Sequence, residues 1–293
     1  MDPNALTTGE WLAAHLDDPD VRILQVQFEP DMDDYSEGHI PGASYVFWKD
    51  LAWDDYERQF LTPAQMAERL GALGVGPDTT LVLYAGRNHY AMYLYWILKD
   101  MAGHADVRVL DGSKKRWTMD GHPLTTDVPD VAAVAYPAPA RERDDSTRVY
   151  RDDVLANLGA AGRVLIDART PDEYEGTKLK PGDGFDFGAE RYGHIPGARN
   201  LHARDLMNPD DFTVRPREEL EAMFREVGAA PDQADEVVAY CRLSHRGNSL
   251  RFIAANVLGW DHIRVYDGSW TEWGSSVGLP VERDPDVVAP KGP

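Results

Sequence analysis

The length of the chain, 293 residues, exceeds that of a typical single domain and predicts two domains that can each bury a core. The composition, with 43% hydrophobic and 27% charged residues, is typical of a globular protein, and no apolar run approaches the ~20 residues that span a bilayer. A formal net charge of -20 argues against nucleic acid and anionic membranes as partners, since the protein would repel both.

The first half of the chain alternates short apolar runs with helical patterns. Residues 1–10 contain no basic stretch followed by an apolar one, so we expect no secretory signal and a cytoplasmic location. Thr62-Pro-Ala-Gln65 has the form of a capping box with proline at the first helical position, and it predicts a helix that begins there. Strand-like runs alternating with such helices indicate an α/β domain with a parallel sheet.

Four segments of the first half recur, in the same order, in the second half. The six residues Gly38-His-Ile-Pro-Gly-Ala43 return unchanged 155 residues later. The matched segments are residues 38–43 with 193–198, 81–84 with 236–240, 108–113 with 264–269 and, at a smaller offset of 141 residues, 22–24 with 163–165. Several ordered matches at nearly one offset predict a tandem repeat of one domain.

The repeat also predicts the boundaries of the two domains. We expect a first domain over residues 1–126, a proline-containing linker over 127–148, a second domain over 149–283 and a flexible tail over 284–293. The second half carries about 14 extra residues within 175–191, whose glycine, proline and charge content predicts an exposed loop. In that half we expect strands over residues 164–167, 236–240 and 262–266, and a helix over 217–227.

The only cysteine, Cys241, follows one of these strands directly. A single cysteine cannot form an internal disulfide or build a thiolate metal site, and beside an apolar strand it is more often an inert core residue than a nucleophile. Its surroundings favour the nucleophile. Residues 237–260 contain no Asp or Glu, where composition would place about four, but they contain Arg242, His245 and Arg246.

The residues after Cys241 predict a cradle for an anionic sulfur. Gly247-Asn-Ser249 leads into a helix expected over residues 250–258 and closed by Gly259. Backbone N–H groups of the loop, among them those of Leu243, Ser244 and Gly247, would converge on the sulfur. Since a thiol attacks as its thiolate, which cations and a helix N-terminus stabilise, this nest suits a thiolate, a persulfide or an oxyanion.

Taken together, these segments resemble the tandem-domain rhodaneses. The resemblance covers nearly the whole chain. It rests on the two Gly-His-Ile-Pro-Gly-Ala segments, on Asp167-Ala-Arg169 with Glu173-Tyr174, on Cys241-Arg-Leu-Ser-His-Arg246, and on Asp267-Gly-Ser-Trp-Thr-Glu-Trp273. It implies two tandem rhodanese-like domains, each a mainly parallel sheet flanked by helices, of which the second is catalytic.

The first half lacks the residues that the resemblance would make catalytic. Ala85 stands at the position of Cys241 and, counted from Arg22 and Arg163, Val26 and Phe28 replace Asp167 and Arg169. We therefore expect the first domain to be structural, with a regulatory or partner-binding role as the alternative.

The resemblance implies a ping-pong sulfurtransferase that forms a persulfide on Cys241 and needs no cofactor or metal ion. Its expected partners are a small anionic sulfur donor and a cyanide or thiol acceptor, or a sulfur-accepting protein. Arg242 and Arg246 favour thiosulfate, because two guanidinium groups suit a dianion, whereas relatives that use 3-mercaptopyruvate tend to have a small uncharged loop beginning Cys-Gly. His245 and Arg191 complete the expected donor site, although Arg191 could equally be a solvated loop residue.

The remaining residues of these motifs are expected to be structural. Asp167 and Arg169 should form a buried pair beneath the site. His39 and His194 should support the fold, since one of them lies in the half that has no nucleophile.

Two other functions remain open. Cysteine phosphatases of the dual-specificity cell-cycle type share the fold implied here, but their loop has five residues between cysteine and arginine, and only four separate Cys241 from Arg246. The shorter loop favours a single sulfur over a phosphoryl group. The other alternative is a non-catalytic carrier or interaction module whose Cys241 receives sulfur from a partner protein.

Overall fold

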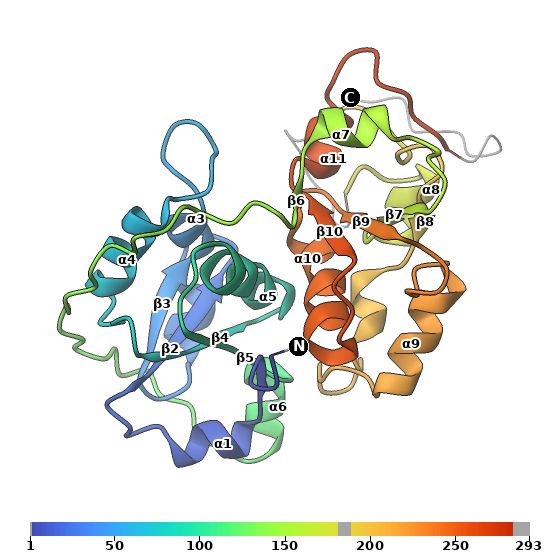
Figure 1. Ribbon diagram of the computed structural model, residues 1–293. Coiled ribbons are helices and arrows are strands. Elements are labelled where there is room, and N and C mark those ends of the chain that lie inside the picture. Colours follow the sequence, from blue (N-terminus) through green and yellow to red (C-terminus); the bar gives the residue numbers. More distant parts are fainter. Residues whose placement is uncertain (1, 181–188, 284–293) are drawn as a thin grey trace. The chain divides into compact units, whose positions relative to one another are not determined.

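The computed structural model describes residues 2–180 and 189–283 (Figure 1). Contacts divide the chain into two compact units, each with its own sheet. One unit comprises Asp2–Asp145 and Asn208–Val214; the other comprises Ser146–Met207 and the described residues from Arg215 on. A short segment from the second half of the sequence therefore folds with the first unit, and the repeat gave no sign of this.

The first unit is a five-stranded parallel sheet in the order β1-β5-β4-β2-β3 (Figure 1). Its strands are β1 Leu6–Thr7, β2 Val21–Gln27, β3 Ala43–Phe47, β4 Thr80–Ala85 and β5 Asp106–Leu110. Its helices are α1 Gly9–Ala14, α2 Asp33–Glu37, α3 Trp48–Ala52, α4 Pro63–Ala72, α5 His89–Tyr95, the π-helix η1 Trp96–Met101 and α6 Ser113–Met119.

The second unit repeats this topology as β6-β10-β9-β7-β8, again with parallel pairs. Its strands are β6 Arg148–Val149, β7 Arg163–Asp167, β8 Arg199–Asn200, β9 Glu236–Tyr240 and β10 Ile263–Tyr266. Its helices are α7 Arg151–Ala156, α8 Pro171–Glu175, the 3-10 helix η2 Ala203–Leu206, α9 Arg217–Glu226, α10 His245–Phe252, the π-helix η3 Ile253–Leu258 and α11 Ser269–Trp273. The prediction of two tandem α/β domains with parallel sheets is confirmed.

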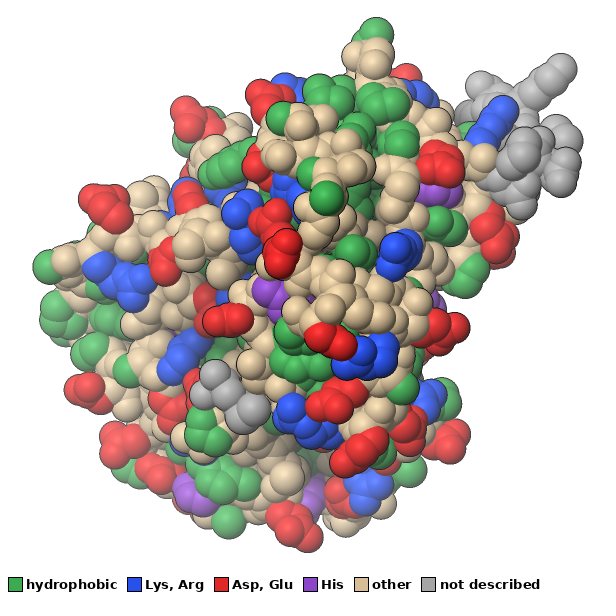
Figure 2. Space-filling view, turned by 45° about the vertical axis from the view of Figure 1, so that its right-hand side comes forward, with side chains coloured by type: hydrophobic (Ala, Val, Ile, Leu, Met, Phe, Trp, Pro, Cys, Tyr) green, Lys and Arg blue, Asp and Glu red, His purple; other side chains and the backbone are tan. Residues whose placement is uncertain are grey.

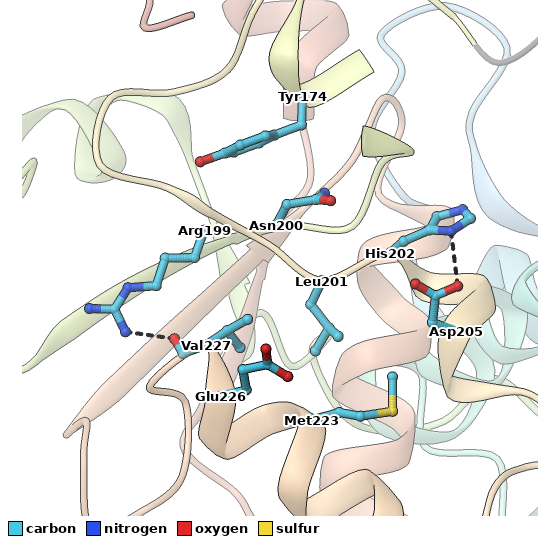
Figure 3. Close-up of a pocket in the computed structure, with 9 residues that line it drawn as sticks. All are labelled: Tyr174, Arg199, Asn200, Leu201, His202, Asp205, Met223, Glu226 and Val227. Carbon is cyan, nitrogen blue, oxygen red and sulfur yellow. Dashed lines mark hydrogen bonds and ion pairs between the residues drawn. The ribbon is translucent and has the colours of Figure 1, made fainter. Parts of the chain in front are cut away.

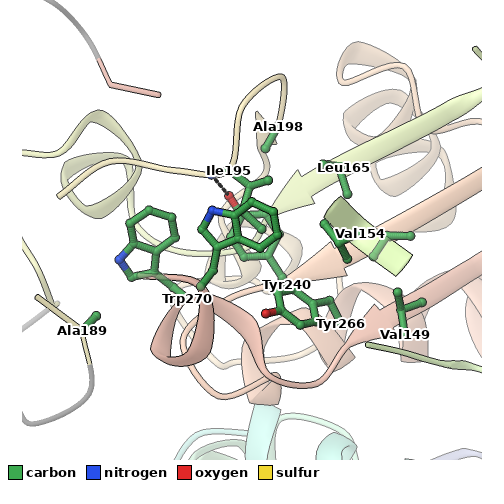
Figure 4. Packing of buried hydrophobic residues seen from close by; sticks show 11 residues of the cluster. Val149, Val154, Leu165, Ala189, Ile195, Ala198, Tyr240, Tyr266 and Trp270 are labelled. Carbon is green, nitrogen blue, oxygen red and sulfur yellow. Dashed lines mark hydrogen bonds between the residues drawn. The ribbon is translucent and has the colours of Figure 1, made fainter. Parts of the chain in front are cut away.

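Aromatic side chains fill much of the core beside the second sheet (Figure 4). Tyr240, Trp270 and Trp273 are buried there, and the backbone N–H of Ile195 donates to the Tyr240 hydroxyl at 3.1 Å. The first unit has the same arrangement, with the N–H of Ile40 donating to Tyr84. Each repeated Gly-His-Ile-Pro-Gly-Ala segment is thereby hydrogen-bonded to the central strand of its sheet, β4 in the first unit and β9 in the second.

Some helices begin and end where the sequence predicts, but the helix after Cys241 begins earlier. Thr62 and Gln65 form the predicted capping box at the start of α4. The prediction for the helix after Cys241 was wrong at its start, because α10 begins at His245 and not after Ser249. Ser244 takes φ 63 and turns the chain into the helix several residues earlier. Arg246 and Gly247 therefore belong to the first helical turn. Gly259 ends the following π-helix with φ 75, as predicted.

Part of the predicted loop over 175–191 and the predicted tail over 284–293 lie outside the described residues. The linker region, residues 127–145, has no helix or strand, and its Val134 N–H donates to the carbonyl of Gly71 in the first unit. Within the described part of the chain, no helix combines the length and the apolar character needed to cross a bilayer. Acidic and basic side chains are interspersed over the face shown in Figure 2.

Asp111, at the end of β5, anchors the segment Asn208–Val214 to the first unit. Its carboxylate accepts the N–H of Val214 at 2.8 Å, while Arg116 pairs with Asp211 of the segment at 3.1 Å. Burial raises the pKa of Asp111 to about 6 and the Asp211 charge adds to the rise, whereas hydrogen bonds from the N–H groups of Val214 and Gly112 and the Arg116 charge oppose it.

We expect Asp111→Asn to stabilise the first unit at neutral and alkaline pH. Because the folded-state pKa is raised, the wild type loses stability as pH rises from about 4 through about 6, and asparagine does not ionise. A rise of about two pKa units corresponds to at most about 3 kcal/mol of unfolding free energy. Denaturant unfolding should show this advantage near pH 8 and a smaller one near pH 4.5, whereas the exposed control Asp210→Asn should show neither. A pH-independent difference would contradict the assignment.

Candidate active site

Cys241 lies where β9 ends, and its loop is very short. The free thiol is buried, with 1% of the residue exposed. Only Arg242, Leu243 and Ser244 separate it from the first residue of α10. A Cβ atom at Gly247 would lie 3.2 Å from Cα of Tyr240, so this glycine allows α10 to approach the end of β9 closely. The helix N-terminus is thus held directly after the cysteine, a position that stabilises an anion.

Ser269 holds the loop from the neighbouring strand end. Its Oγ accepts the N–H groups of Cys241 at 3.2 Å and Ser244 at 3.1 Å, and donates to the carbonyl of Tyr266 at 2.8 Å. Of the predicted nest residues, Ser244 therefore gives its N–H to Ser269. The N–H groups of Leu243 and Gly247 have no partner among the residues that the structure describes, and their place in an anion nest stays a prediction.

A second support beneath the loop is a buried ion pair. Ser244 Oγ donates to Asp267 at 3.1 Å, and the other carboxylate oxygen of Asp267 accepts from Arg148 at 2.8 Å. Both side chains of the pair are almost fully buried. Asp267 and Ser269, two residues of one repeated segment, thus both support the Cys241 loop.

Arg246 faces a carboxylate that its sequence position did not reveal. Its Nη1 and Nη2 donate to the two oxygens of Glu173 at 2.7 and 3.0 Å. Glu173 also caps α8 by accepting the N–H and the hydroxyl of Thr170. Burial would lower the pKa of Arg246, but the bonds to Glu173 and the charges of Glu173 and Cys241 raise it. The Arg246 guanidinium stays protonated within electrostatic reach of the sulfur.

The predicted pair of Asp167 and Arg169 is confirmed. Arg169 Nη2 lies 2.6 Å from Asp167 Oδ2, and neither side chain is exposed. Arg169 also donates to the carbonyl of Gly193 at 2.6 Å and lies 4.5 Å from the ring of Trp270. The pair therefore supports the repeated Gly-His-Ile-Pro-Gly-Ala segment.

The repeated histidines are structural, as predicted. His39 stacks on Tyr35 and its ring nitrogens lie within hydrogen-bond distance of the carbonyls of Tyr35 and Asp127. His194 stacks on Tyr174 in the same way.

The other predicted donor-binding residues lie in different surroundings. Arg242 donates to the carbonyl of Leu179 at 3.0 Å, and His245 is buried at the start of α10. The recorded contacts of Arg191 are with the segment after α11 and not with the Cys241 loop. Its guanidinium donates to four carbonyls there, those of Trp273, Gly274, Ser276 and Leu279. Of the predicted donor-binding residues, Arg246 lies within electrostatic reach of Cys241. The roles of Arg242 and His245 stay predictions, while the contacts of Arg191 favour a structural role.

The first unit carries a different polar cluster at the corresponding place, of which Gln25 is buried. β2 pairs Gln25 with Tyr84, and β7 pairs Asp167 with Tyr240. Because the two tyrosines match in the repeat, Gln25 and Gln27 replace Asp167 and Arg169, and the assignment to Val26 and Phe28 was wrong by one residue. Both glutamines donate to Asp34, which also pairs with Lys114 at 2.6 Å.

A cavity of about 490 Å³ opens beside β8 in the second unit (Figure 3). It is lined by Tyr174, Arg199, Asn200, Leu201, His202, Asp205, Met223, Glu226 and Val227. None of these residues belongs to the Cys241 loop. Burial lowers the pKa of His202, Asp205 opposes this change, and the Arg246 charge adds to the lowering. The Arg246 charge is thus within electrostatic reach of His202 in this cavity.

Comparison with known proteins agrees with this geometry. The rhodanese-like domain matches the chain twice, over residues 8–120 and 151–276. The chain is 40% identical to the sulfur carrier protein TtuD of Thermus thermophilus, covering 96% of this chain and 97% of that protein. It is 38% identical to a protein of Saccharopolyspora erythraea named "Putative thiosulfate sulfurtransferase", covering 95% of this chain and 96% of the relative.

Among solved structures, the anaerobic ergothioneine biosynthesis enzyme of Chlorobium limicola is similar, with a TM-score of 0.79 and 26% identity over 96% of this chain and 70% of that one. The family model covers most of the chain, and two relatives match nearly its full length well above the level of chance. The chain therefore belongs to the rhodanese family of sulfurtransferases, with a rhodanese-like domain in each half.

Proposed function

We propose that this protein is a thiosulfate sulfurtransferase that carries sulfur as a persulfide on Cys241. The observation that carries the proposal is the position of the cysteine, buried between the end of β9 and the N-terminus of α10, with Arg246 in electrostatic reach. This arrangement stabilises a thiolate and then a persulfide anion. The first unit, with Ala85 at the matching position, serves as a structural domain.

The proposed reaction has two steps. The Cys241 thiolate attacks the outer sulfur of thiosulfate, the sulfur–sulfur bond of the donor breaks, and its electron pair leaves with sulfite. The terminal sulfur of the Cys241 persulfide is then attacked by cyanide or a thiolate, so that thiocyanate or a new persulfide forms and the Cys241 thiolate returns. Charge is conserved in both steps, and neither requires an oxidant or a general base.

The loop supports thiosulfate over other donors. Arg246 lies within electrostatic reach of the thiol and Arg242 follows Cys241 directly in the chain, and guanidinium groups pair well with the oxygens of a sulfonate. The 3-mercaptopyruvate alternative lacks this support, since its monocarboxylate needs less charge. His245 completes the proposed donor site, and Arg191 adds positive charge to the domain without a direct contact.

A sulfur carrier is the second candidate, and the similarity to a protein named as one supports it. In that role Cys241 would receive sulfur from a protein donor and pass it to another protein. The same cradle would protect the persulfide, so the two candidates differ in their donors and not in their site.

Assays of the purified protein separate these functions. We expect thiocyanate from thiosulfate and cyanide, less from 3-mercaptopyruvate, and no hydrolysis of p-nitrophenyl phosphate. If neither small donor produces thiocyanate, the carrier function replaces the enzyme. Hydrolysis of the phosphate ester would support the phosphatase instead.

A further inference from the structure

Glu173 places a buried negative charge beside the proposed donor site. Its side chain is fully buried, and both oxygens are bonded to Arg246. Burial would raise the pKa of Glu173, but its bonds to Arg246 and the charges of Arg246 and Arg169 lower it. The carboxylate is therefore ionised at neutral pH, although no part of it reaches solvent.

The ion pair changes what Arg246 can offer a donor. Glu173 uses one N–H on each terminal nitrogen of the guanidinium, so three of its five donors remain for other partners. The opposite charge at 2.7 Å also offsets much of the attraction that Arg246 exerts on an approaching anion. The orientation of Arg246 is fixed, and its effective charge is reduced.

We propose that Glu173 determines the donor preference of the Cys241 site by holding Arg246 in one orientation and offsetting its positive charge. The proposal rests on the function proposed above. A doubly charged donor binds less tightly than it would to a guanidinium without a carboxylate partner. A singly charged donor loses less binding affinity for the same reason. Glu173 is thus a positioning residue that acts through Arg246.

The chain itself supplies the conservative substitution. Thr62 and Gln65 form the same capping box at α4 that Thr170 and Glu173 form at α8. Glutamine therefore caps such a helix in this protein, and Glu173→Gln should keep the start of α8 intact. The amide oxygen can still accept from Arg246, so that the main change is the loss of one negative charge.

The test measures binding in a Cys241→Ala background, where neither turnover nor thiol ionisation contributes. Calorimetry compares thiosulfate, a dianion, with methanethiosulfonate, a monoanion. Adding Glu173→Gln should tighten thiosulfate binding on the order of tenfold and methanethiosulfonate binding about threefold, because the interaction scales with the charge of the donor. With Cys241 present, KM for thiosulfate should fall while kcat changes little.

An Arg246→Met background tests whether Glu173 changes donor binding through Arg246. There, Glu173→Gln should leave the ratio of the two dissociation constants unchanged, since the guanidinium that Glu173 holds is absent. Equal changes for both donors, or weaker binding of both, would show that Glu173 only supports the fold and would overturn the proposal.

Failure of the proposed function has a different signature. A protein that gains no sulfur from thiosulfate by mass spectrometry, yet changes donor preference with Glu173→Gln, would disprove the thiosulfate reaction and leave the role of Glu173 standing. Persulfide formation from thiosulfate with an unchanged donor preference would support the thiosulfate reaction and overturn the role of Glu173. Absence of thiosulfate binding in both variants would remove both proposals.

Discussion

Replacing Cys241 by serine is expected to abolish both thiocyanate formation and sulfur loading from thiosulfate. A serine hydroxyl is not ionised at neutral pH and does not form a persulfide, and the chain has no second cysteine that could substitute for it. Cyanide assays and intact-protein mass spectrometry after incubation with thiosulfate should lose their signals together. The thiol is buried and serine is similar in size, so thermal unfolding should change little.

The two readouts distinguish the ways in which this expectation could fail. Thiocyanate formation by the serine variant above the rate in buffer would show that sulfur does not pass through Cys241. Loss of thiocyanate with retained sulfur loading would place the bound sulfur on a group other than Cys241.

The second large effect is expected from Arg169→Met, which leaves Asp167 buried without its ion partner. Neither side chain of this pair is exposed, and removing one member of such a pair costs about 3–5 kcal/mol of unfolding free energy. The unfolding midpoint should fall by roughly 10 °C. The carbonyl of Gly193 would also lose the hydrogen bond from Arg169, so the damage should reach the repeated segment.

A matched control is the exposed pair of Arg225 and Asp232, whose atoms approach to 2.9 Å. Arg225→Met should leave the unfolding free energy almost unchanged, because solvent screens the pair. The double variant Asp167→Leu with Arg169→Met should recover part of the loss, since it leaves no buried charge. Similar effects of Arg169→Met and Arg225→Met would refute this account of the buried pair.

The sequence predicted the parts of the fold that depend on local patterns. The internal repeat predicted two sheets of equal topology, and Thr62 and Gln65 predicted the start of α4. Cys241 could be placed at a strand end because apolar runs in parallel sheets end at one edge. Apart from the repeat, each of these signals is contained in a few consecutive residues.

The contacts that the sequence did not reveal join distant residues or depend on register. Glu173 and Arg246 are 73 positions apart, and no local pattern states that they meet. The assignment of Val26 and Phe28 failed because a shift of one residue in a strand exchanges its faces, which alignment of a short match cannot detect. The start of α10 depends on the left-handed conformation of Ser244, which is uncommon for residues other than glycine.

The segment Asn208–Val214 makes the repeat less modular than its sequence suggests. A cut within residues 127–148 would give an N-terminal fragment whose Asp111 and Arg116 lack the partners Val214 and Asp211. The C-terminal fragment would carry Asn208–Val214 as an unsupported insertion. The gene can be divided into two halves, but the first folded unit cannot, since it is assembled from two separate stretches of polypeptide. Its folding can be completed only after the chain has been synthesised as far as Val214, well into the second half.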